Sequence, residues 1–310
     1  MTNIVPVIEA TIPTRPWWIY FWRHRAAAVS VVFISLVLLL ALFGPIIYKG
    51  LSAELRQVRD GVYQDYESIN ADPSSTHWLG ADYLGRDTLT RLLLAIRISL
   101  SVAFVVEAIN IVLGGLLGLF AGYFGGWVDM LISRLADMLF AFPGLLLAIL
   151  ISAIFGSTAR ELYGSTGRLL LVATALSLVS WPLMARFVRS ETLSLKSRDF
   201  VIAAEGLGAS NLRMIWKHML PNVAWLIVIA STLDVASVIV NEATLSLLGL
   251  GIEEPGSSLG LMIFRAVGKL ESHPIQVFIP ALMITSLVLA FSFLGDGMRD
   301  ALDPRTRQNS

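Results

Sequence analysis

The sequence AAAVSVVFISLVLLLALFGPIIY, residues 26–48, contains no charged side chain. At 1.5 Å per residue, a helix of about 23 residues crosses the roughly 30 Å hydrocarbon layer of a bilayer. Arg15, Arg23 and Arg25 precede this run, as in a secretory signal peptide, but the run is longer than a signal core and Gly50-Leu51-Ser52 is a weak cleavage site. We expect the run to stay in the mature protein as a membrane-spanning helix.

Five further apolar stretches of spanning length follow the first. They cover residues 98–123, 130–155, 169–187, 223–248 and 277–298. The composition agrees, since 55% of the residues are hydrophobic, 15% are charged and the mean hydropathy is +0.71. The sequence therefore predicts an all-α, polytopic membrane protein with six transmembrane helices and both termini on one side. Basic residues are dense between Arg186 and Lys217, which favours a cytoplasmic position for that loop and for both termini.

Charge and composition exclude other classes of protein. The 23 basic and 23 acidic residues cancel, so no attraction to nucleic acid is expected. The chain has no cysteine for a disulfide, a thiolate nucleophile or a thiolate-bound metal. Its four histidines lack the close spacing of metal ligands. We expect no cofactor, and no catalytic, cofactor-binding or metal-binding residue.

Glycines and prolines predict how the spans pack and bend. Four glycines recur every four residues along one side of the second span and its end, where they would let another helix approach closely: Gly114, Gly118, Gly122 and Gly126. Kinks are expected at three prolines within or near spans: Pro143, Pro182 and Pro280.

Ionisable side chains inside a bilayer are costly and therefore mark functional candidates. Glu107, Asp234 and Glu242 lie within predicted spans, and they leave open a proton-coupled secondary carrier. Asp129, Arg134 and Asp137 lie together near the start of one span. Because Arg134 and Asp137 are three residues apart on a helix, we expect them to form a structural ion pair.

One segment fits the Gly-x-Ser-x-Gly pattern of a serine hydrolase. It is Gly256-Ser-Ser-Leu-Gly260, with Ser258 as the nucleophile and His273 as the nearest candidate base. The motif requires a strand that leads into a helix, whereas Ser258 follows Pro255 in a loop between two spans. An enzyme is therefore the weaker alternative.

Two loops stand out from the spans. The loop of about 49 residues from Lys49 to Arg97 is predicted to be an extracytoplasmic cap. The loop DFVIAAEGLGASNLRMIWKHMLPN, residues 199–222, predicts two short helices with a break, in which Gly206 and Gly208 allow a sharp turn. Ser210 is expected to cap the second helix, and Pro221 to end it before the next span.

The loop at 199–222 has two interpretations on physical grounds alone. Ala203 and Ala204 present a small-residue surface against which another protein could pack. Alternatively, the segment is an amphipathic helix that lies on lipid, with Trp216 and Lys217 as its anchors.

These residues resemble a known family, the inner-membrane permease subunits of binding-protein-dependent ATP-binding cassette (ABC) importers. Within it, the chain is similar to the C-type subunit of dipeptide and oligopeptide permeases. The loop looks like the family's EAA loop, a Glu-Ala-Ala motif followed by a glycine and a later Leu-Pro-Asn, and the matches are Ala203, Ala204, Gly208, Leu220, Pro221 and Asn222. Ile202 stands where the glutamate of the motif belongs, and Glu205, one helical turn on, is the candidate replacement. Residues 77–87, 242–251 and 295–304 extend the resemblance over most of the chain.

The resemblance implies a type I ABC importer permease fold with five parts. These are a cytoplasmic tail (1–25), the first transmembrane helix (26–48), an extracytoplasmic loop (49–96), a permease core of five transmembrane helices with a coupling loop at 190–222 (97–304), and a second cytoplasmic tail (305–310). Ala203, Ala204, Glu205, Gly208, Leu220, Pro221 and Asn222 are then the residues that couple the permease to an ATPase.

The resemblance also implies partners in the inner membrane of a prokaryote. They are a B-type permease subunit, two cytoplasmic ATP-binding subunits, an extracytoplasmic substrate-binding protein and membrane lipid. The sequence has no Gly-x-x-x-x-Gly-Lys-[Ser/Thr] phosphate loop, since its only Gly-Lys pair, Gly268-Lys269, has Ile263 at the position of the first glycine. The chain is thus expected not to be an enzyme, with ATP hydrolysis by its partners. Di- or oligopeptides are the implied cargo, and no cargo ligands are assigned.

Overall fold

The structure is a computed structural model that describes residues 17–51 and 54–302. The predicted tails therefore lie partly (1–25) or wholly (305–310) outside the described residues. In the described part of the chain, secondary structure is helical apart from one isolated bridge between Ala81 and Asp87. This agrees with the all-α prediction.

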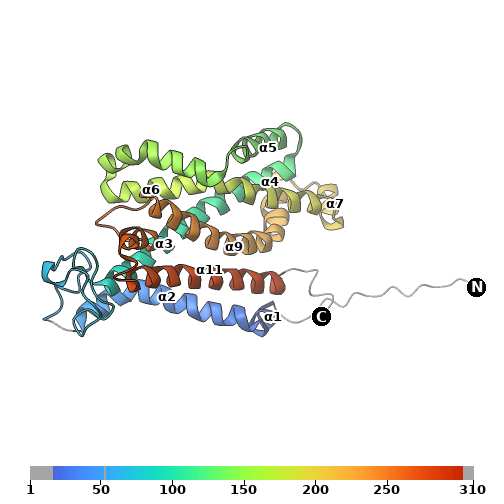
Figure 1. The fold of residues 1–310 in the computed structure, drawn as a ribbon. Helices are drawn as coiled ribbons and strands as arrows, with labels where there is room; N and C mark the ends of the chain where they lie inside the picture. The colour runs from blue at the N-terminus through green and yellow to red at the C-terminus, as the bar shows by residue number, and fades with distance from the viewer. Residues whose placement is uncertain (1–16, 52–53, 303–310) are drawn as a thin grey trace, which may run out of the picture.

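Five helices are long and apolar enough to cross a membrane (Figure 1). Among the described residues they are α2 (Arg25–Gly50), the continuous run Thr88–Phe124, α6 (Gly144–Lys196), the continuous run Asn211–Leu247 and α11 (Ile275–Leu302). The first run consists of α3 (Thr88–Ile109), the π-helical turn η2 (Asn110–Gly114) and α4 (Gly115–Phe124). The second consists of α8 (Asn211–Arg213), the π-helical turn η3 (Met214–Met219) and α9 (Leu220–Leu247).

Shorter helices lie between and beside the long ones. They are α1 (Trp17–Arg23), the 3-10 turn η1 (Tyr66–Ser68), α5 (Gly126–Phe140), α7 (Asp199–Gly206), α10 (Leu259–Ala266) and the 3-10 turn η4 (Val267–Lys269).

Helix α6 turns back on itself at Gly164, whose φ of +60° is a conformation that suits glycine. Its two arms run side by side (Figure 1). The predicted span at 169–187 lies in the second arm. The predicted span at 130–155 is wrong as one helix, because α5 ends at Phe140 and Pro143 stands extended just before α6. The ring of proline fixes φ and removes a donor, so the chain restarts its helix after it. Pro182 and Pro280 lie inside helices.

The glycine stripe of the second span packs against the second arm of α6. A β-carbon at Gly114, Gly118 or Gly122 would overlap backbone or side-chain atoms of that arm, whereas Gly126 has open space and begins α5. The packing prediction is confirmed for the first three glycines and wrong for Gly126. Apolar side chains such as Ile46 and Trp127, 71% and 72% exposed, cover the outer faces of the bundle, as suits lipid.

Ion pairs join α5 to α6 and correct a prediction. Asp137 pairs with Arg186 at 2.6 Å and Asp129 with Arg189 at 2.5 Å, both on the second arm of α6. Asp137 therefore does not pair with Arg134. A packed neighbouring helix offers a partner with better geometry than a residue on the same helix.

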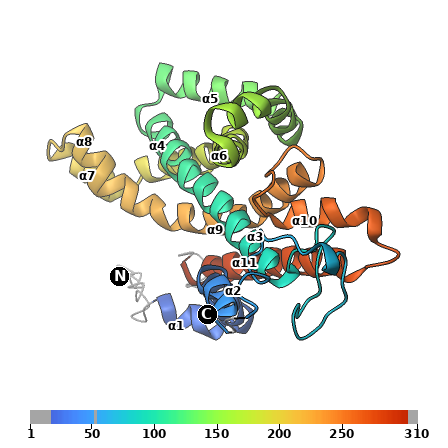
Figure 2. The same cartoon turned by 90° about the vertical axis from the view of Figure 1, so that its left-hand side faces the viewer.

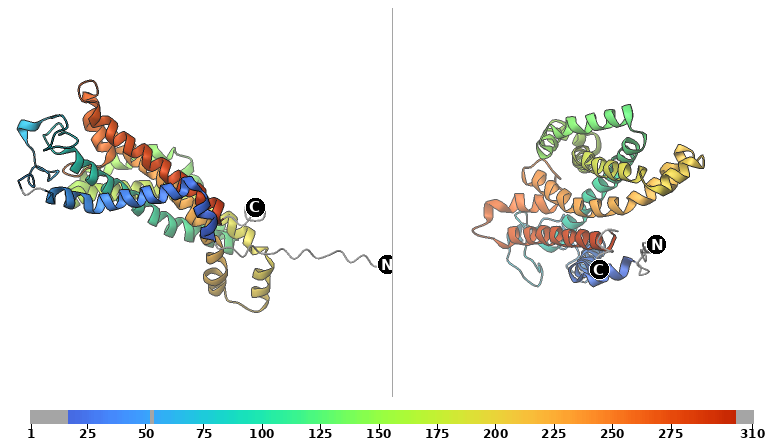
Figure 3. Two further views of the ribbon diagram at one scale, coloured as in Figure 1. Left: turned by 90° about the horizontal axis from the view of Figure 1, so that it is seen from below. Right: turned by 90° about the vertical axis from the view of Figure 1, so that its right-hand side faces the viewer.

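The bundle has two distinct ends. The loop that precedes α3 forms a cap at one end, together with the turn of α6 at Gly164 (Figure 1). Helix α7 lies at the other end, as do α1 and the described end of α11. Figure 2 and Figure 3 show that α7 and α8 lie in a hairpin that projects from the bundle.

Candidate functional site

Helix α7 presents an apolar surface outward from the projecting hairpin. Its anchor is Val201, which is fully buried against Met214 and Met219. On the other side Ile202 and Ala203 are exposed, and Leu207 beyond the helix end is 89% exposed. An apolar side chain this exposed, on a segment held by a buried anchor, is suited to contact another protein.

Gly208 ends α7 in a defined way. Its φ is +79°, its N–H donates to the carbonyl of Glu205 (2.9 Å), and the next N–H, of Ala209, donates to Ala204 (3.1 Å). These two bonds form a Schellman motif, in which the residue with positive φ is usually glycine because it has no β-carbon. The predicted turn is confirmed at Gly208, while Gly206 is helical.

The return helix departs from the prediction at two residues. Ser210 occupies the cap position of α8, but its side chain makes no capping hydrogen bond. Pro221 does not end a helix, because the run Asn211–Leu247 passes through it. The π-helical turn η3 stands immediately before the proline, where the hydrogen-bond register shifts.

Two contacts that the sequence did not suggest tie the hairpin to the second span. Tyr123 Oη donates to Oδ1 of Asn211 (2.9 Å), and Lys196 Nζ donates to the backbone oxygen of Tyr123 (2.8 Å). Both cross the boundary between the bundle and the hairpin. No local pattern marks these residues, since each bond joins positions more than 70 residues apart.

The structure brings only part of the predicted set together. Ala203, Ala204, Glu205 and Gly208 share α7 and its end, with Glu205 exposed one turn from Ile202. Leu220, Pro221 and Asn222 lie instead at the start of α9, where Asn222 Nδ2 donates to the backbone oxygen of His218 (2.6 Å).

The chain matches two known family models. Residues 114–308 match the model of the binding-protein-dependent transport system inner membrane component, and residues 13–73 match the N-terminal TM domain of oligopeptide transport permease C. The chain belongs to this permease family. It is a multi-pass inner-membrane permease subunit of the ABC importer type.

Individual relatives match over nearly the whole permease. The glutathione transport system permease protein GsiD of Pectobacterium atrosepticum is 37% identical over 99% of this chain and 97% of its own length. The GsiD protein of Escherichia coli is 38% identical over 98% of this chain and 96% of its own length. The dipeptide transport system permease protein DppC of Alkalihalophilus pseudofirmus is 35% identical over 96% of this chain and 92% of its own length.

Two intramembrane acids of the permease meet at an amide. Asn110 Nδ2 lies 3.1 Å from Oδ2 of Asp234 and 3.5 Å from Oε2 of Glu107, and it also contacts Ser180. Neither acid forms an ion pair within the described residues. Asn110 opens the π-helical turn η2, a feature frequent at functional sites. Neither these contacts nor the relatives support the proton-coupled alternative.

Glu242 and Ser258 have structural roles. The fully buried Glu242 accepts hydrogen bonds from Ser99 and Ser246, both 2.8 Å. Ser258 is also fully buried, donates to Ser246 (3.1 Å) and accepts from Leu261 N at the start of α10. His273, the candidate base, is bonded to Ser272 in a separate loop. The geometry contradicts a nucleophilic Ser258, because a nucleophile must be reachable and hydrogen-bonded to its base.

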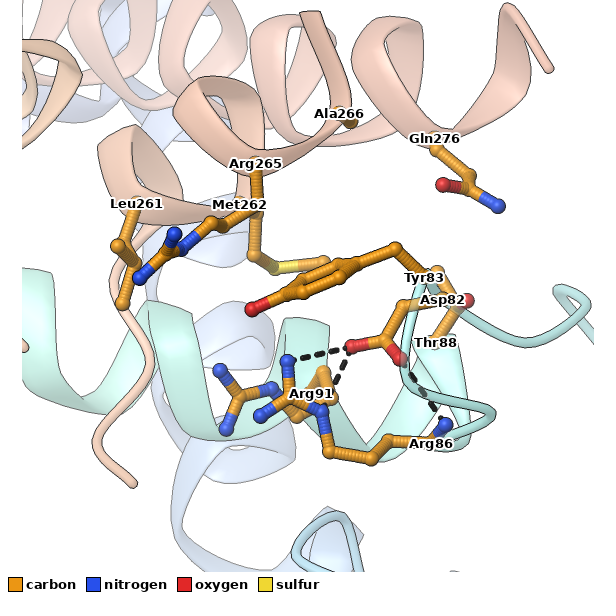
Figure 4. Close-up of a pocket in the computed structure, with 10 residues that line it drawn as sticks. All are labelled: Asp82, Tyr83, Arg86, Thr88, Arg91, Leu261, Met262, Arg265, Ala266 and Gln276. Atoms are coloured by element: carbon orange, nitrogen blue, oxygen red, sulfur yellow. Dashed lines mark hydrogen bonds and ion pairs between the residues drawn. The ribbon is translucent and has the colours of Figure 1, made fainter. Parts of the chain in front are cut away.

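The cap is fastened to the bundle by buried ion pairs. The guanidinium group of Arg86 donates to both carboxylate oxygens of Glu254 (3.0 and 3.1 Å). It also pairs with Asp82 (2.8 Å), as Figure 4 shows. Burial raises the pKa of Glu254, but the hydrogen bonds from Arg86 and Tyr83 outweigh it and hold the pKa below its ordinary value. Burial lowers the pKa of Arg86, but its hydrogen bonds to Glu254 and Asp82 outweigh this effect and raise the pKa above its ordinary value.

The cavity beside this cluster is small. Figure 4 shows the ring of Tyr83 between Arg86 and Arg91 on one side and the side chains of α10 on the other. The volume is about 30 Å³, which is room for a water molecule and not for a peptide. We therefore infer that the contacts of Arg86 with Glu254 and Asp82 have a structural role and hold the cap in place.

No group of three or more His, Asp or Glu side chains in the described part of the chain is arranged to hold a metal ion.

Proposed function

We propose that this permease forms the translocation pathway of an ATP-driven importer of di- or oligopeptides. A B-type permease subunit would complete the pathway, two cytoplasmic ATP-binding subunits would drive it, and an extracytoplasmic binding protein would deliver the peptide. The dipeptide and glutathione permeases among the relatives support a peptide cargo. The absence of a phosphate-loop motif from the sequence supports ATP hydrolysis by separate subunits.

The observation that carries the proposal is the exposed helix α7 with its Schellman ending. In the proposed mechanism α7 docks into an ATP-binding subunit, with Ala203, Ala204 and Glu205 at the contact and Gly208 setting the turn. Closure of the ATPase dimer moves α7, and the hairpin passes this motion to the bundle. Leu220, Pro221 and Asn222 act at the base of the hairpin, where the motion enters α9.

The orientation follows from the same proposal. Helix α7 lies at the end of the bundle that also carries α1 and the described end of α11 (Figure 1), so docking to a cytoplasmic ATPase places both termini in the cytoplasm. The cap then faces the outside. We propose the same five parts as the sequence predicts. They are the tails (1–25 and 305–310), the first transmembrane helix (26–48), the extracytoplasmic loop (49–96) and the permease core (97–304) with its coupling loop at 190–222.

Reconstitution tests the proposal. Proteoliposomes are made with the permease, its partner permease and both ATP-binding subunits. They should accumulate peptide when ATP is supplied on the side of the ATP-binding subunits and the binding protein is present on the opposite side of the membrane. A protonophore should leave this uptake unchanged. Accumulation by the purified permease alone, without ATP or partners, would refute it.

A further inference from the structure

A cleft opens at the cap end of the bundle, between the turn of α6 and the loop that follows α9. Its volume is about 590 Å³, enough for a small peptide. The first arm of α6 lines one wall with Ser152, Ser157 and Arg160, and the second arm adds Arg168. Glu253 lines it from the loop after α9.

The charges in the cleft are arranged around one shared carboxylate. Arg168 Nη2 lies 3.0 Å from Oε1 of Glu253, and Arg160 Nη1 lies 3.1 Å from Oε2. The side chain of Arg168 is only 5% exposed, while that of Arg160 is 65% exposed. Two guanidinium groups share one carboxylate, so this cluster by itself has one excess positive charge, and Glu161 at the exposed turn brings the formal charge of the lining to zero.

Gly156 makes room for the buried arginine. A β-carbon at this position would overlap Nη1 of Arg168, which donates instead to the backbone oxygen of Ser152 (3.2 Å). The chain therefore places a residue without a side chain where an arginine crosses between the arms. Burying a guanidinium in this way is costly unless its hydrogen bonds are made.

Three buried polar atoms on the wall have no hydrogen-bond partner among the described residues. They are Nε of Arg168, Oγ of Ser152 and Oε2 of Glu253, the last of which keeps its ion pair with Arg160. Buried polar groups in folded proteins are nearly always satisfied, so an unsatisfied donor next to a cavity points to a polar ligand. Ser152 lies eight residues before Arg160 on one helix, so the cleft reaches about 12 Å along the arm.

We propose that this cleft binds the charged ends of a peptide cargo on its way into the pathway. The carboxylate of the peptide accepts hydrogen bonds from Arg160 and Arg168, because a guanidinium fork matches a carboxylate. In an extended dipeptide the ammonium group lies about 7 Å from the carboxylate, and here it lies toward Glu161. This assignment rests on the proposed function, and it names the residues of the permease that contact the cargo.

Cysteine protection tests the cleft directly. The chain has no cysteine, so Ser157→Cys gives it a single thiol in the cleft, and Ser165→Cys, at the turn but outside the lining, is the matched control. Both variants are reacted with a neutral maleimide in the permease–ATPase assembly in nanodiscs, with dialanine, its C-terminal amide or no peptide. We expect dialanine to slow labelling of Ser157→Cys, the amide to protect far less, and Ser165→Cys to react equally throughout.

Substitution of the exposed arginine sharpens the test. Arg160→Gln in the Ser157→Cys background should raise the protecting concentration of dialanine about tenfold, since a charge-assisted hydrogen bond is lost. Equal protection by the amide, or none by dialanine, would overturn the assignment. Protection by cargo-free binding protein alone would also overturn it, because the cleft would then be a docking surface.

Uptake measured with the same assemblies in proteoliposomes separates the two proposals. Peptide-specific protection without ATP-driven uptake would refute the proposed function and leave the cleft assigned. Uptake that remains normal without peptide-specific protection would refute the cleft alone.

Discussion

Tyr123 Oη donates a hydrogen bond to Oδ1 of Asn211, 2.9 Å away, and so joins the end of the second span to the start of the helix that returns from α7. Lys196, at the end of α6, bonds to the backbone of the same tyrosine. All three chain segments that meet at the hairpin are therefore fixed at one point. In the proposed mechanism, a displacement of α7 passes to the bundle through this point.

Tyr123→Phe removes this hydrogen bond and keeps the ring. We expect a loss of about 0.5–1.5 kcal/mol in local stability, because a neutral hydrogen bond contributes that much. The number of peptides imported per ATP hydrolysed should fall, while the assembly still forms. The matched control is Tyr163→Phe at the exposed turn of α6, which should transport normally. Unaltered coupling in Tyr123→Phe would show that this bond carries no motion.

Gly208 and Gly206 form a second matched pair. Gly208→Ala forces a β-carbon into a left-handed conformation at a cost of about 1–2 kcal/mol. ATP hydrolysis should become uncoupled from uptake, although the chain still inserts into the membrane. Gly206→Ala should transport normally, because Gly206 is helical and a β-carbon there meets nothing within 4 Å. Both rates are measured in proteoliposomes, and coupled transport in Gly208→Ala would contradict the assigned turn.

The glycine stripe predicts a stability difference between neighbours on one helix. Gly118→Ala places a methyl group against the backbone of Ala185, and overpacking of this kind costs about 1–3 kcal/mol. Gly115→Ala meets only the end of Ile227, at an ordinary contact distance of 3.6 Å. The melting temperature in detergent should fall for the first variant and not for the second. Equal melting temperatures would mean that α4 and α6 do not pack this closely.

The cap should loosen in acid. The pKa of Glu254 in the folded protein lies below its ordinary value of 4.5, so the stabilisation by this carboxylate is complete above that value and is lost as the pH falls through the folded pKa. Hydrogen exchange in residues 54–87, relative to α11, should therefore rise when the pH is lowered from about 6 to about 3. In Glu254→Gln the exchange should already be raised at neutral pH.

Glu271→Gln is the control for this prediction, since Glu271 is an exposed carboxylate elsewhere at the cap end. Its cap should respond to acid as the unchanged protein does. A cap whose exchange is the same in Glu254→Gln and Glu271→Gln would show that the bond between Arg86 and Glu254 does not hold it.

The sequence by itself determined the membrane-spanning helical class, most of the spans and the turn at Gly208. These features are local: an uncharged run of spanning length, or a glycine after a helix, carries its signal within a few residues. The break at Pro143 is also predictable from the sequence, because this proline stands inside the predicted span at 130–155.

Only the tertiary structure decided which distant side chains meet. The partner of Asp137 is Arg186 and not Arg134, Asn110 lies between Glu107 and Asp234, and Arg168 reaches Glu253. Each of these contacts depends on how far one helix is rotated and shifted against another, and that is fixed by the packing of small residues along the whole interface. Because several registers satisfy the same hydrophobic pattern, the pattern predicts that helices pack and leaves their pairs of contacting residues to the fold.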